Sequence, residues 1–305
     1  MKVLVVGLGV QGNKRLAIAG DDVVATVDPV IPTAHYKSIL DVPLNIYEAA
    51  LLCIPDRAKF DTIEYLLQHR KHVLVEKPLL TNHPADLERL RALAQQNHVT
   101  CYTAYNHRFE PHLVRVQQEL TVGTIGKVYL CRMFYGNGTA MDVKRSPWRD
   151  RGLGALTDLG SHMLDLTQFF FGNNDQFFQL WAGNTFENRV YDHFLMGSHG
   201  CPMLEFEGTM VSWRNTFTLD VFGEHGSLHV FCLCKWGPSI FTLRKRVLPS
   251  GRPLEQTDTI EIKDPTWGLE YSHFQKLCTT GASNIETDIW INARLRKLAG
   301  GKELL

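Results

Sequence analysis

The chain is predicted to be an α/β protein, with an N-terminal Rossmann dinucleotide-binding domain and a C-terminal α+β domain built on a large, mostly antiparallel open sheet. Two observations predict this class. About the first hundred residues alternate short apolar runs with helix-compatible segments, which is typical of a parallel sheet covered by helices on both faces. From residue 177 onward, strand-like runs follow one another with few helices between them. We therefore expect domains over residues 1–107 and 108–305.

Composition narrows the classes of function. The formal net charge is zero, which argues against a nucleic-acid or membrane surface as partner. No apolar run reaches the length of a membrane helix, and the chain starts directly with a core strand, which leaves no room for a signal peptide. The seven cysteines are an odd number scattered among apolar neighbours, as in cytosolic proteins with free thiols. We expect a cytoplasmic protein without a metal site.

The first element is a strand over residues 2–6, which runs into the turn Gly7-Leu-Gly-Val-Gln-Gly12. A helix-compatible stretch follows over 13–19, and a second apolar run over 23–27 ends on Asp28. A strand, a glycine turn, a helix and a distant acidic residue form the Rossmann fingerprint in its full context. The alternative is a glycine-rich turn without a ligand, in which Asp28 caps the end of a strand.

Each residue of this fingerprint has a physical task. Gly7 permits the tight turn, Gly9 lets the backbone approach a pyrophosphate, and Gly12 lets the helix lie close to the strand. The helix N-terminus offers N–H groups to the phosphates. Asp28 would accept hydrogen bonds from the adenosine ribose hydroxyls, and its charge would repel a 2′-phosphate. The fingerprint therefore predicts NAD as cofactor in preference to NADP.

The remaining elements follow from apolar periodicity. In the first domain we expect strands at 50–54, 73–75 and 99–105, helices at 60–69 and 84–97, and no confident helix within 29–47. In the second domain we expect helices at 111–120, 157–171 and 285–298, and strands at 128–135, 177–182, 190–196, 202–207, 211–221 and 227–234. Thr157 is expected to cap its helix and Gly172 to end it. The polar segment 249–265 is expected to be a loop or an edge hairpin.

The antiparallel sheet is also expected to carry apolar residues on both faces, with Phe217, Leu219 and Val221 on one side. An exposed apolar face implies a partner, so we expect a homo-oligomer, either a dimer or a tetramer.

A second cluster, Glu76-Lys77-Pro78, follows the apolar run at 73–75. A Lys at the carboxyl end of a Rossmann strand points toward the ligand crevice, where it can donate hydrogen bonds to the nicotinamide ribose and to a substrate hydroxyl. The Lys77–Pro78 peptide is a candidate for the cis form. The alternative is a solvated Lys in a strand-to-helix loop.

A third cluster lies on the helix at 157–171. Asp158, His162 and Asp165 fall on one face, because they are separated by one helical turn each. A His between two carboxylates is suited to proton transfer, since the carboxylates can orient the ring and tune its pKa. Gly154 and Gly160 leave space for something to approach closely. The alternative is a partly buried His that a neighbouring Asp satisfies.

Together these clusters resemble the glucose–fructose oxidoreductase / inositol dehydrogenase / rhizopine-catabolism family, often abbreviated Gfo/Idh/MocA. The resemblance covers the whole chain and includes the glycine turn ending at Gly12, Cys53-Ile-Pro-Asp56, Glu76-Lys77-Pro78, Asn106-His-Arg-Phe109, the Asp158/His162 helix and the segment Asp220 to Leu228. One loop departs from the pattern. The family often has Pro-Asn-x-x-His where this chain has Pro55-Asp-Arg-Ala-Lys59. Asp56 can still cap the next helix there.

The resemblance implies a catalytic set of Lys77, Asp158 and His162. His162 would exchange the hydroxyl proton, Lys77 would hydrogen-bond the same oxygen, and Asp158 would orient the substrate. The cofactor-binding residues implied are Gly7, Gly9, Val10, Gln11, Gly12, Asp28, Ile54, Pro55, Glu76, Lys77 and Asn106. The substrate-binding residues implied are Lys77, Arg108, Tyr135, Trp148, Arg149, Asp158 and His162. Trp148 would stack on a sugar face, and Arg149 would hold a phosphate or carboxylate. The alternative for both is a surface loop that the Trp anchors.

Three functions fit this pattern. The first is an NAD(P)-dependent oxidoreductase that transfers a hydride between nicotinamide and a ring hydroxyl or keto carbon of a sugar, nucleotide sugar or cyclitol. The second is a glycoside hydrolase or lyase that oxidises and reduces its NAD within each cycle, because the same three residues would serve. The third is a non-catalytic sensor of NAD(H). The presence of both Lys77 and His162 argues against the sensor, since non-catalytic relatives usually lose one of them.

Overall fold

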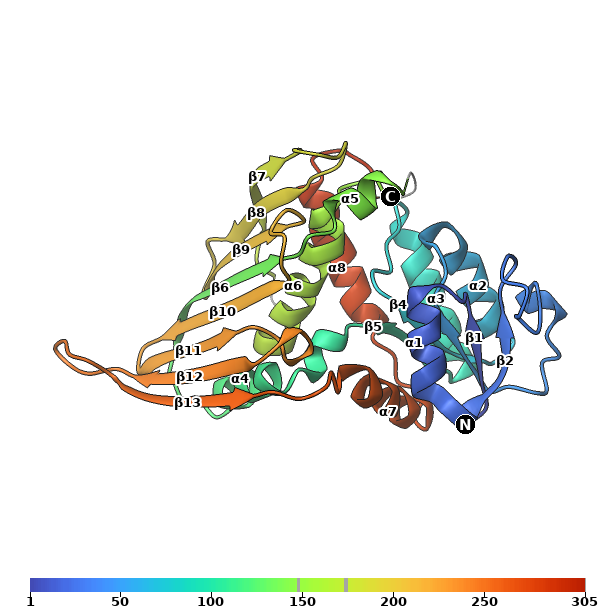
Figure 1. The fold of residues 1–305 in the computed structure, drawn as a ribbon, viewed down its shortest axis with the longest axis horizontal. Coiled ribbons are helices and arrows are strands. Elements are labelled where there is room, and N and C mark those ends of the chain that lie inside the picture. Colours follow the sequence, from blue (N-terminus) through green and yellow to red (C-terminus); the bar gives the residue numbers. More distant parts are fainter. Residues whose placement is uncertain (147–148, 173–174, 305) are drawn as a thin grey trace. The chain divides into compact units, whose positions relative to one another are not determined.

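The computed structural model describes residues 1–146, 149–172 and 175–304, and it divides into two compact units (Figure 1). The first comprises Met1–Asn106 and Trp267–Asn292, and the second His107–Thr266 and Ala293–Leu305. The division differs from the expected single boundary after residue 107. The difference arises because a helix near the C-terminus, α7 (Thr266–Cys278), buries Tyr271 and Phe274 in the first unit's core.

The first unit is built on a five-stranded parallel sheet, as the sequence predicts. Its strands are β1 (Val3–Val6), β2 (Val23–Val27), β3 (Ala49–Leu52), β4 (His72–Glu76) and β5 (Cys101–Ala104), in the order β2-β1-β3-β4-β5. These strands are almost entirely buried on both faces, which explains their unbroken apolar runs. The helices of the unit are α1 (Val10–Ala19), α2 (Asp56–Gln68), α3 (Pro84–Asn97), α7 and the start of α8 (Ile285–Leu298).

Two core clusters cover the two faces of this sheet. On one face, the side chains of the even-numbered residues of β1, such as Leu4, pack with Ile63 of α2 and Leu90 of α3. On the other face, Val5 packs with Leu16 of α1 and Phe274 of α7. Between β2 and β3 the chain forms one short 3₁₀ turn, Ile39–Asp41, and no α-helix, as the sequence predicts for residues 29–47. Loops follow the carboxyl ends of the strands, and this edge of the sheet is where ligands bind in this class of fold.

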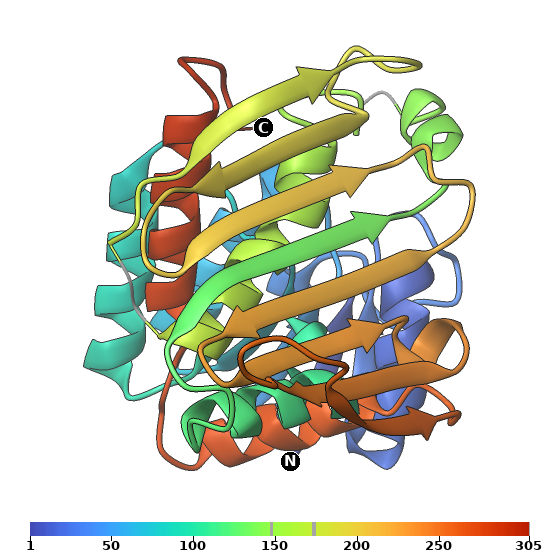
Figure 2. The same cartoon turned by 90° about the vertical axis from the view of Figure 1, so that its left-hand side faces the viewer.

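The second unit is built on an eight-stranded sheet in the order β13-β12-β11-β10-β6-β9-β8-β7 (Figure 2). Its strands are β6 (Val128–Gly136), β7 (Gln179–Asn184), β8 (His193–Ser198), β9 (Met203–Thr209), β10 (Thr216–Gly223), β11 (Gly226–Phe231), β12 (Ser239–Lys245) and β13 (Leu254–Ile260). All pairs of neighbours are antiparallel except β6 and β9. The predicted mostly antiparallel sheet is confirmed. The segment expected as a loop or edge hairpin contains β13, which pairs with β12 at the sheet edge.

Helices α4 (Pro111–Thr121) and α6 (Ala155–Phe171) cover one face of this sheet, and a short helix, α5 (Ala140–Lys144), follows β6. Phe217, Leu219 and Val221 of β10 point to this covered face and are fully buried. They therefore belong to the unit's own core. The expectation that they form an exposed apolar face is wrong, because the helices bury that side of the sheet.

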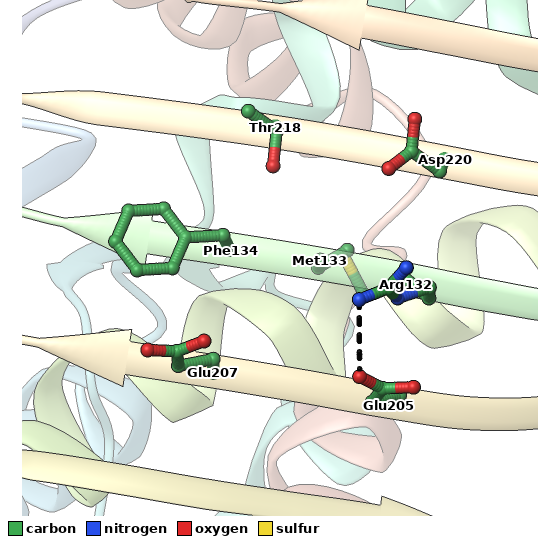
Figure 3. A pocket seen from close by; sticks show the side chains of 7 residues that line it. All are labelled: Arg132, Met133, Phe134, Glu205, Glu207, Thr218 and Asp220. Carbon is green, nitrogen blue, oxygen red and sulfur yellow. Dashed lines mark ion pairs between the residues drawn. The ribbon is translucent and has the colours of Figure 1, made fainter.

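The opposite face of the sheet is largely polar at its centre (Figure 3). Arg132 of β6 forms an ion pair with Glu205 of β9 at 3.3 Å, and Thr218 and Asp220 project beside them from β10. Alternation along the strands places these residues opposite to the buried ones. Within the described residues, no helix is long and apolar enough to cross a membrane.

The boundaries of α6 correct one prediction and confirm another. The helix starts at Ala155, and its N-cap is Gly154, which makes no side-chain cap. The hydroxyl of Thr157 instead donates to the carbonyl of Gly154 at 3.0 Å, so Thr157 lies inside the first turn and is not the cap. Gly172 ends the helix with φ 69°, as expected. Gly154 and Gly160 do permit close approach, but to the chain's own Val190 and Phe194.

Candidate active site

The glycine turn of the first unit has the geometry that a dinucleotide needs. Gly7 has φ 89°, and a Cβ there would lie 2.4 Å from the carbonyl oxygen of Cys53. A Cβ on Gly12 would lie 1.8 Å from the carbonyl oxygen of Gly7, so the helix packs directly on the turn. By contrast, a Cβ on Gly9 would meet nothing within 4 Å. The space in front of Gly9 is thus open, and the turn fits a pyrophosphate.

The start of α1 offers backbone donors beside this open space. No side chain caps the helix at Gly9, and Val10 and Gln11 in the first turn are exposed. Their amides belong to the turn whose partial positive charge attracts phosphates. Asn13 fixes the turn from within, because its side-chain amide donates to the carbonyls of Leu8 and Gly9 at 2.9 and 3.1 Å.

Asp28, at the end of β2, is bound by three backbone amides. Its Oδ2 accepts a hydrogen bond from Leu8 at 2.8 Å, and its Oδ1 accepts from Val30 at 2.8 Å and Ile31 at 2.9 Å. Burial opposes ionisation, but these hydrogen bonds outweigh it and hold the pKa of Asp28 below its ordinary value. Asp28 is therefore a carboxylate that also ties the glycine turn to the loop after β2. The cap at the strand end, which the sequence offers as an alternative for Asp28, is therefore present in the structure.

The loop after β4 carries Lys77, which is half-buried, and its Lys77–Pro78 peptide is cis. A buried side chain holds this loop. The ammonium of Lys59 donates to the carbonyl oxygens of Glu76 and Pro78, each at 2.7 Å, so it grips the chain on both sides of Lys77. Lys59 occupies the position where the family often has His. The departure in sequence thus has a structural function in this chain.

Asp56 completes this arrangement, although not as predicted. The N-cap of α2 is Pro55, with no side-chain cap, and Asp56 is the first helical residue. The carboxylate of Asp56 instead forms an ion pair with Lys59 at 2.7 Å. The prediction that Asp56 caps the helix is therefore wrong, because the neighbouring ammonium binds it.

Glu76 is anchored by a buried cation. Arg15 of α1 donates to Glu76 at 2.7 Å and to Glu270 of α7 at 2.6 Å, and its guanidinium lies 4.3 Å from the ring of Trp267. The two carboxylates offset the cost of burying Arg15. Through Arg15, Glu76 therefore connects the Lys77 loop to α1 and α7.

The other predicted cofactor residues lie at strand ends of the same unit. Ile54 follows β3, and its Cγ2 lies 3.1 Å from where a Cβ of Gly7 would be, so it packs on the glycine turn. Pro55 is exposed beside it. Asn106 is largely buried and opens the 3₁₀ turn η3 (Asn106–Phe109), which follows β5. The structure thus places these three residues at the carboxyl edge of the sheet, where the fold binds its ligands.

In the second unit, α6 presents the candidate acid–base group. His162 is 4% exposed, and its ring stacks on His107 of η3, with centroids 4.0 Å apart and planes 16° apart. Asp158 lies one turn earlier on the helix and is half-buried. The ring of His162 is therefore held in a fixed plane within a largely buried setting, next to a carboxylate on the same face.

Asp165 has a different partner from the one predicted. It is fully buried, and both its oxygens accept from Nε of Arg108 at 2.9 Å, with a further bond from Nη2 to Oδ1 at 2.7 Å. Burial raises the pKa of Asp165, and Arg108 acts in the opposite direction. The expectation that Asp165 orients His162 is wrong, because its carboxylate is engaged by the guanidinium. This pair also gives Arg108 a structural task.

Tyr135, at the end of β6, is buried beside the histidine pair. Its ring lies 5.4 Å from that of His107 and 5.9 Å from that of His162, and Trp236 packs on it at 5.6 Å. Burial raises the pKa of the Tyr135 hydroxyl well above its ordinary value, so the phenol is neutral. Tyr135 therefore belongs to the aromatic shell of His162.

The segment predicted to bind substrate is only partly described. Trp148 lies outside the described residues. Arg149 is half-buried, and its neighbour Asp150 accepts hydrogen bonds from the amides of Arg189 at 2.8 Å and Val190 at 3.3 Å. Asp150 thus fastens the end of the segment to the chain before β8.

Two residues near His162 escaped the sequence analysis. Lys235 of the 3₁₀ turn η4 (Cys234–Trp236) lies with its ammonium 2.8 Å from Nε2 of His107. Glu110 is buried and accepts from the amide of Cys234 at 3.2 Å and from its thiol at 3.0 Å. No local spacing could reveal these contacts, because the partners are more than a hundred residues apart in the chain.

The comparisons with known proteins agree with this geometry. A family model described as "Oxidoreductase family, NAD-binding Rossmann fold" matches residues 1–105, and one described as "GFO/IDH/MocA C-terminal domain" matches residues 113–229. Inositol 2-dehydrogenase of Rhizobium meliloti is 27% identical over 130 residues, which is 41% of this chain and 37% of that protein. The rhizopine catabolism protein MocA of Rhizobium meliloti is 22% identical over 196 residues, or 59% of this chain and 60% of that protein. The matched part of this chain thus spans less than two thirds of the length of each of these relatives.

Solved structures share the fold along the whole chain. Levoglucosan dehydrogenase in complex with NADH has a TM-score of 0.82 at 16% identity, covering 100% of this chain and 99% of that one. UDP-N-acetylglucosamine 3-dehydrogenase of Acidithiobacillus ferrooxidans has a TM-score of 0.80 at 15% identity, covering 98% and 97%. A protein described as a putative NADPH-dependent oxidoreductase of Desulfitobacterium hafniense has a TM-score of 0.83 at 15% identity, covering 99% and 97%. With both of its family models matched in order, the chain belongs to the Gfo/Idh/MocA family of NAD-binding Rossmann-fold oxidoreductases.

Proposed function

We propose that this protein is an NAD(P)-dependent oxidoreductase that transfers a hydride between nicotinamide and a ring hydroxyl or keto carbon of a sugar, nucleotide sugar or cyclitol. Relatives and structural neighbours with such names support the substrate class, since they include inositol and levoglucosan dehydrogenases. The observation that carries the proposal is the buried and stacked position of His162 on α6. Its imidazole is held in a fixed plane on a buried helix face, as a proton-transfer group requires, in a chain whose other half has a dinucleotide-binding turn.

The catalytic set that we propose is Lys77, Asp158 and His162. His162 takes the proton of the hydroxyl during oxidation and returns it during reduction. Lys77 donates a hydrogen bond to the same oxygen and stabilises the partial negative charge that develops there. Asp158 accepts a hydrogen bond from the substrate and orients it. Bound nicotinamide supplies the hydride acceptor or donor.

We propose NAD as the preferred cofactor, held by Gly7, Gly9 and Gly12, by the first turn of α1 and by Asp28. The ionised carboxylate of Asp28 supports this preference, because it would repel the 2′-phosphate of NADP. Replacing Asp28→Asn removes the charge and keeps one acceptor oxygen. We expect the ratio of NAD to NADP affinity to fall in titrations of the variant. An unchanged ratio would contradict the assignment.

The substrate-binding role of Arg108, Tyr135, Trp148 and Arg149 stays a prediction. The structure supports Arg149 more than Arg108, because Arg108 already binds Asp165 through two of its nitrogens. A homo-oligomer and a cytoplasmic location also stay predictions, which light scattering and cell fractionation would test.

A single-turnover experiment tests the proposed function. Enzyme loaded with NAD is mixed, in excess, with each member of a panel of sugars, nucleotide sugars and cyclitols, and NADH is followed by absorbance. Excess enzyme matters, because a cofactor that is recycled within the cycle escapes detection at steady state. A burst of NADH with one ligand supports the proposal and names the substrate class. NADH that forms and is consumed again, with cleavage of a glycoside and no net NADH at the end, would support the hydrolase or lyase instead.

Absence of any burst, with NAD binding confirmed, would next be tested in the reductive direction with NADH and the corresponding keto sugars. Failure in both directions would overturn the proposal in favour of the NAD(H) sensor. His225→Asn is a matched control for His162→Asn, because His225 is an exposed histidine of the same unit. We expect the control variant to keep the burst.

A further inference from the structure

We propose that His107 and Lys235 are positioning residues for His162: His107 fixes the plane of the catalytic ring, and Lys235, acting through His107, keeps the stacked pair of rings uncharged. This inference rests on the proposed acid–base function of His162. It adds two residues that belong to neither the glycine turn nor the set of Lys77, Asp158 and His162.

Three separate elements of the second unit meet at this point. His162 comes from the middle of α6, His107 from η3, and Lys235 from η4. The rings of His107 and His162 stack with centroids 4.0 Å apart, and the ammonium of Lys235 lies 2.8 Å from Nε2 of His107. His107 is fully buried, and Lys235 is half-buried. The cation therefore contacts the imidazole that stacks on the ring of His162.

The contact between Lys235 and His107 sets the charge of His107. A protonated lysine is a donor only, so Nε2 of His107 must present its lone pair to it. His107 is consequently neutral while Lys235 is charged, and its proton lies on Nδ1. A positive charge on His162 would then lie close to the Lys235 ammonium in a buried setting, where like charges repel strongly. The arrangement thus favours the neutral form of His162, which is the form that accepts a proton from a hydroxyl.

The stack also fixes the orientation of the ring. The planes of His107 and His162 differ by only 16°, and Tyr135 packs against both rings. Trp236, the neighbour of Lys235, closes the far side of Tyr135 at 5.6 Å. A side chain enclosed in this way loses the freedom to rotate about χ2, so its nitrogen atoms keep one direction. Proton transfer gains from such pre-orientation.

Other charged or titratable groups of the second unit face the same cluster. Asp158 lies one turn from His162 on α6 and favours a positive ring, so it opposes Lys235. Tyr135 of β6 is neutral, because burial raises its pKa. Burial likewise raises the pKa of Glu110, while the charge of Lys235 acts on it in the opposite direction. Asp165 is bound by Arg108. Asp264 lies on the side of Glu110 and Cys234, where its charge raises the pKa of both groups. Within this set, Lys235 and Asp158 act on the charge of the stacked pair in opposite directions.

The test is a histidine titration of the full chain by ¹⁵N NMR, with the resonances of His162 assigned by comparison with His162→Asn. Lys235→Met removes the charge and keeps the length of the side chain. We expect the apparent pKa of the stacked pair to rise by about one pH unit. Lys235→Arg should leave it near the wild-type value. Lys245→Met, which removes an exposed charge from β12, is the matched control and should have no effect.

A second readout is the pH profile of kcat/KM for substrate oxidation. In Lys235→Met the acid limb should move upward by the same amount, whereas a loss of structure alone would lower the whole profile without moving the limb. An unchanged His162 titration in Lys235→Met would overturn the inference. Lys235→Gln also removes the charge at this position, so it provides the same test if Lys235→Met does not fold.

The two readouts separate this inference from the proposed function. If the NMR titration shifts and no dehydrogenase activity is found with any substrate, the coupling of Lys235 to His162 stands and the proposed reaction is wrong. If the enzyme is active and the titration does not shift, the reaction stands and Lys235 has no part in it.

Discussion

The glycine turn of the first unit and the His162 helix of the second unit are built in opposite ways. At the turn, the groups offered to a ligand are backbone amides, and the glycines that shape it, Gly7 to Gly12, lie within a few positions of one another. Asp28 and Cys53 support the turn from the ends of the next two strands. Around His162, the groups are side chains brought together from distant segments, such as His107 and Lys235, which are 128 residues apart. The geometry of the first region can therefore be predicted from local sequence, whereas the contacts of the second region can be identified only from the structure.

Because of this difference, we expect substitutions in the two regions to change different properties of the protein. A change in the turn alters the backbone itself, so its effect depends on whether a Cβ has space. A change near His162 alters charge and ring contacts while the backbone stays in place. Stability and cofactor affinity should report on the first region, and pH dependence should report on the second.

Two glycine substitutions give the largest expected contrast within the turn. Gly12→Ala places a Cβ 1.8 Å from a backbone oxygen, so we expect the free energy of unfolding to fall by about 3 kcal/mol. Gly9→Ala meets nothing within 4 Å and should cost only about 1 kcal/mol at this N-cap. We expect NAD affinity to fall roughly tenfold or more in Gly9→Ala, because the methyl group occupies the space of the pyrophosphate.

Urea unfolding and NAD titration of the two variants measure this contrast. The assignment of the pyrophosphate to Gly9 would be contradicted if Gly9→Ala kept its full affinity for NAD. Similar stability in both variants would contradict the tight contact between α1 and the turn.

The same contrast explains how much the sequence could predict. Periodicity and terminal proline or glycine signals predict the helices Pro84–Asn97 and Ile285–Leu298 with correct bounds, because these signals are local. The helix α7 was not predicted, and its packing on the first unit depends on residues more than two hundred positions earlier, such as Arg15. The prediction that Thr157 caps α6 is wrong, because the helix starts two residues earlier, at Ala155.

At the site, the sequence identified the residue types but not their partners. Asp165 was expected beside His162 on the basis of helical spacing, yet Arg108 from another element binds it. Spacing along one helix cannot show which group of a neighbouring element competes for a carboxylate. Whether Lys77, Asp158 and His162 form the catalytic set stays a prediction.

Lys59 is an exception within the first unit, because its side chain binds a segment that lies further along the chain. Lys59→Met leaves the carbonyls of Glu76 and Pro78 without their shared donor. We expect the free energy of unfolding to fall by about 2 kcal/mol and kcat/KM to fall about tenfold, since the backbone around Lys77 loses its clamp. Unfolding curves and steady-state kinetics measure both effects.

Lys71→Met is the matched control, because the ammonium of Lys71 donates to one carbonyl only, that of Tyr47, at 2.9 Å. It should cost less stability and leave kcat/KM unchanged. Equal kinetic effects of the two variants would show that Lys59 has no particular relation to Lys77.

Acid stability provides the smallest effect and tests a feature that the two units share. Asp192 of the second unit accepts hydrogen bonds from the amides of Phe186, Glu187 and Asn188, much as Asp28 accepts from its loop. In both residues burial opposes ionisation, but the hydrogen bonds outweigh it and lower the pKa below the ordinary value of 3.8. The unfolded chain therefore takes up protons first as the pH falls.

Stability contributed by Asp28 and Asp192 is fully present above their ordinary pKa and is lost as the pH falls through the lowered values. Urea unfolding at a series of acid pH values should show this loss, and it should be weaker in Asp192→Asn. A slope that is the same in the variant would contradict the role of these amide bonds.

The most direct test of the central claim compares wild type with His162→Asn in single turnover, with saturating NAD and the ligand that gives the wild-type burst. We predict that the variant binds NAD as tightly as wild type and forms NADH about a thousandfold more slowly. A burst of unchanged rate in His162→Asn would contradict the claim that His162 is the proton-transfer group.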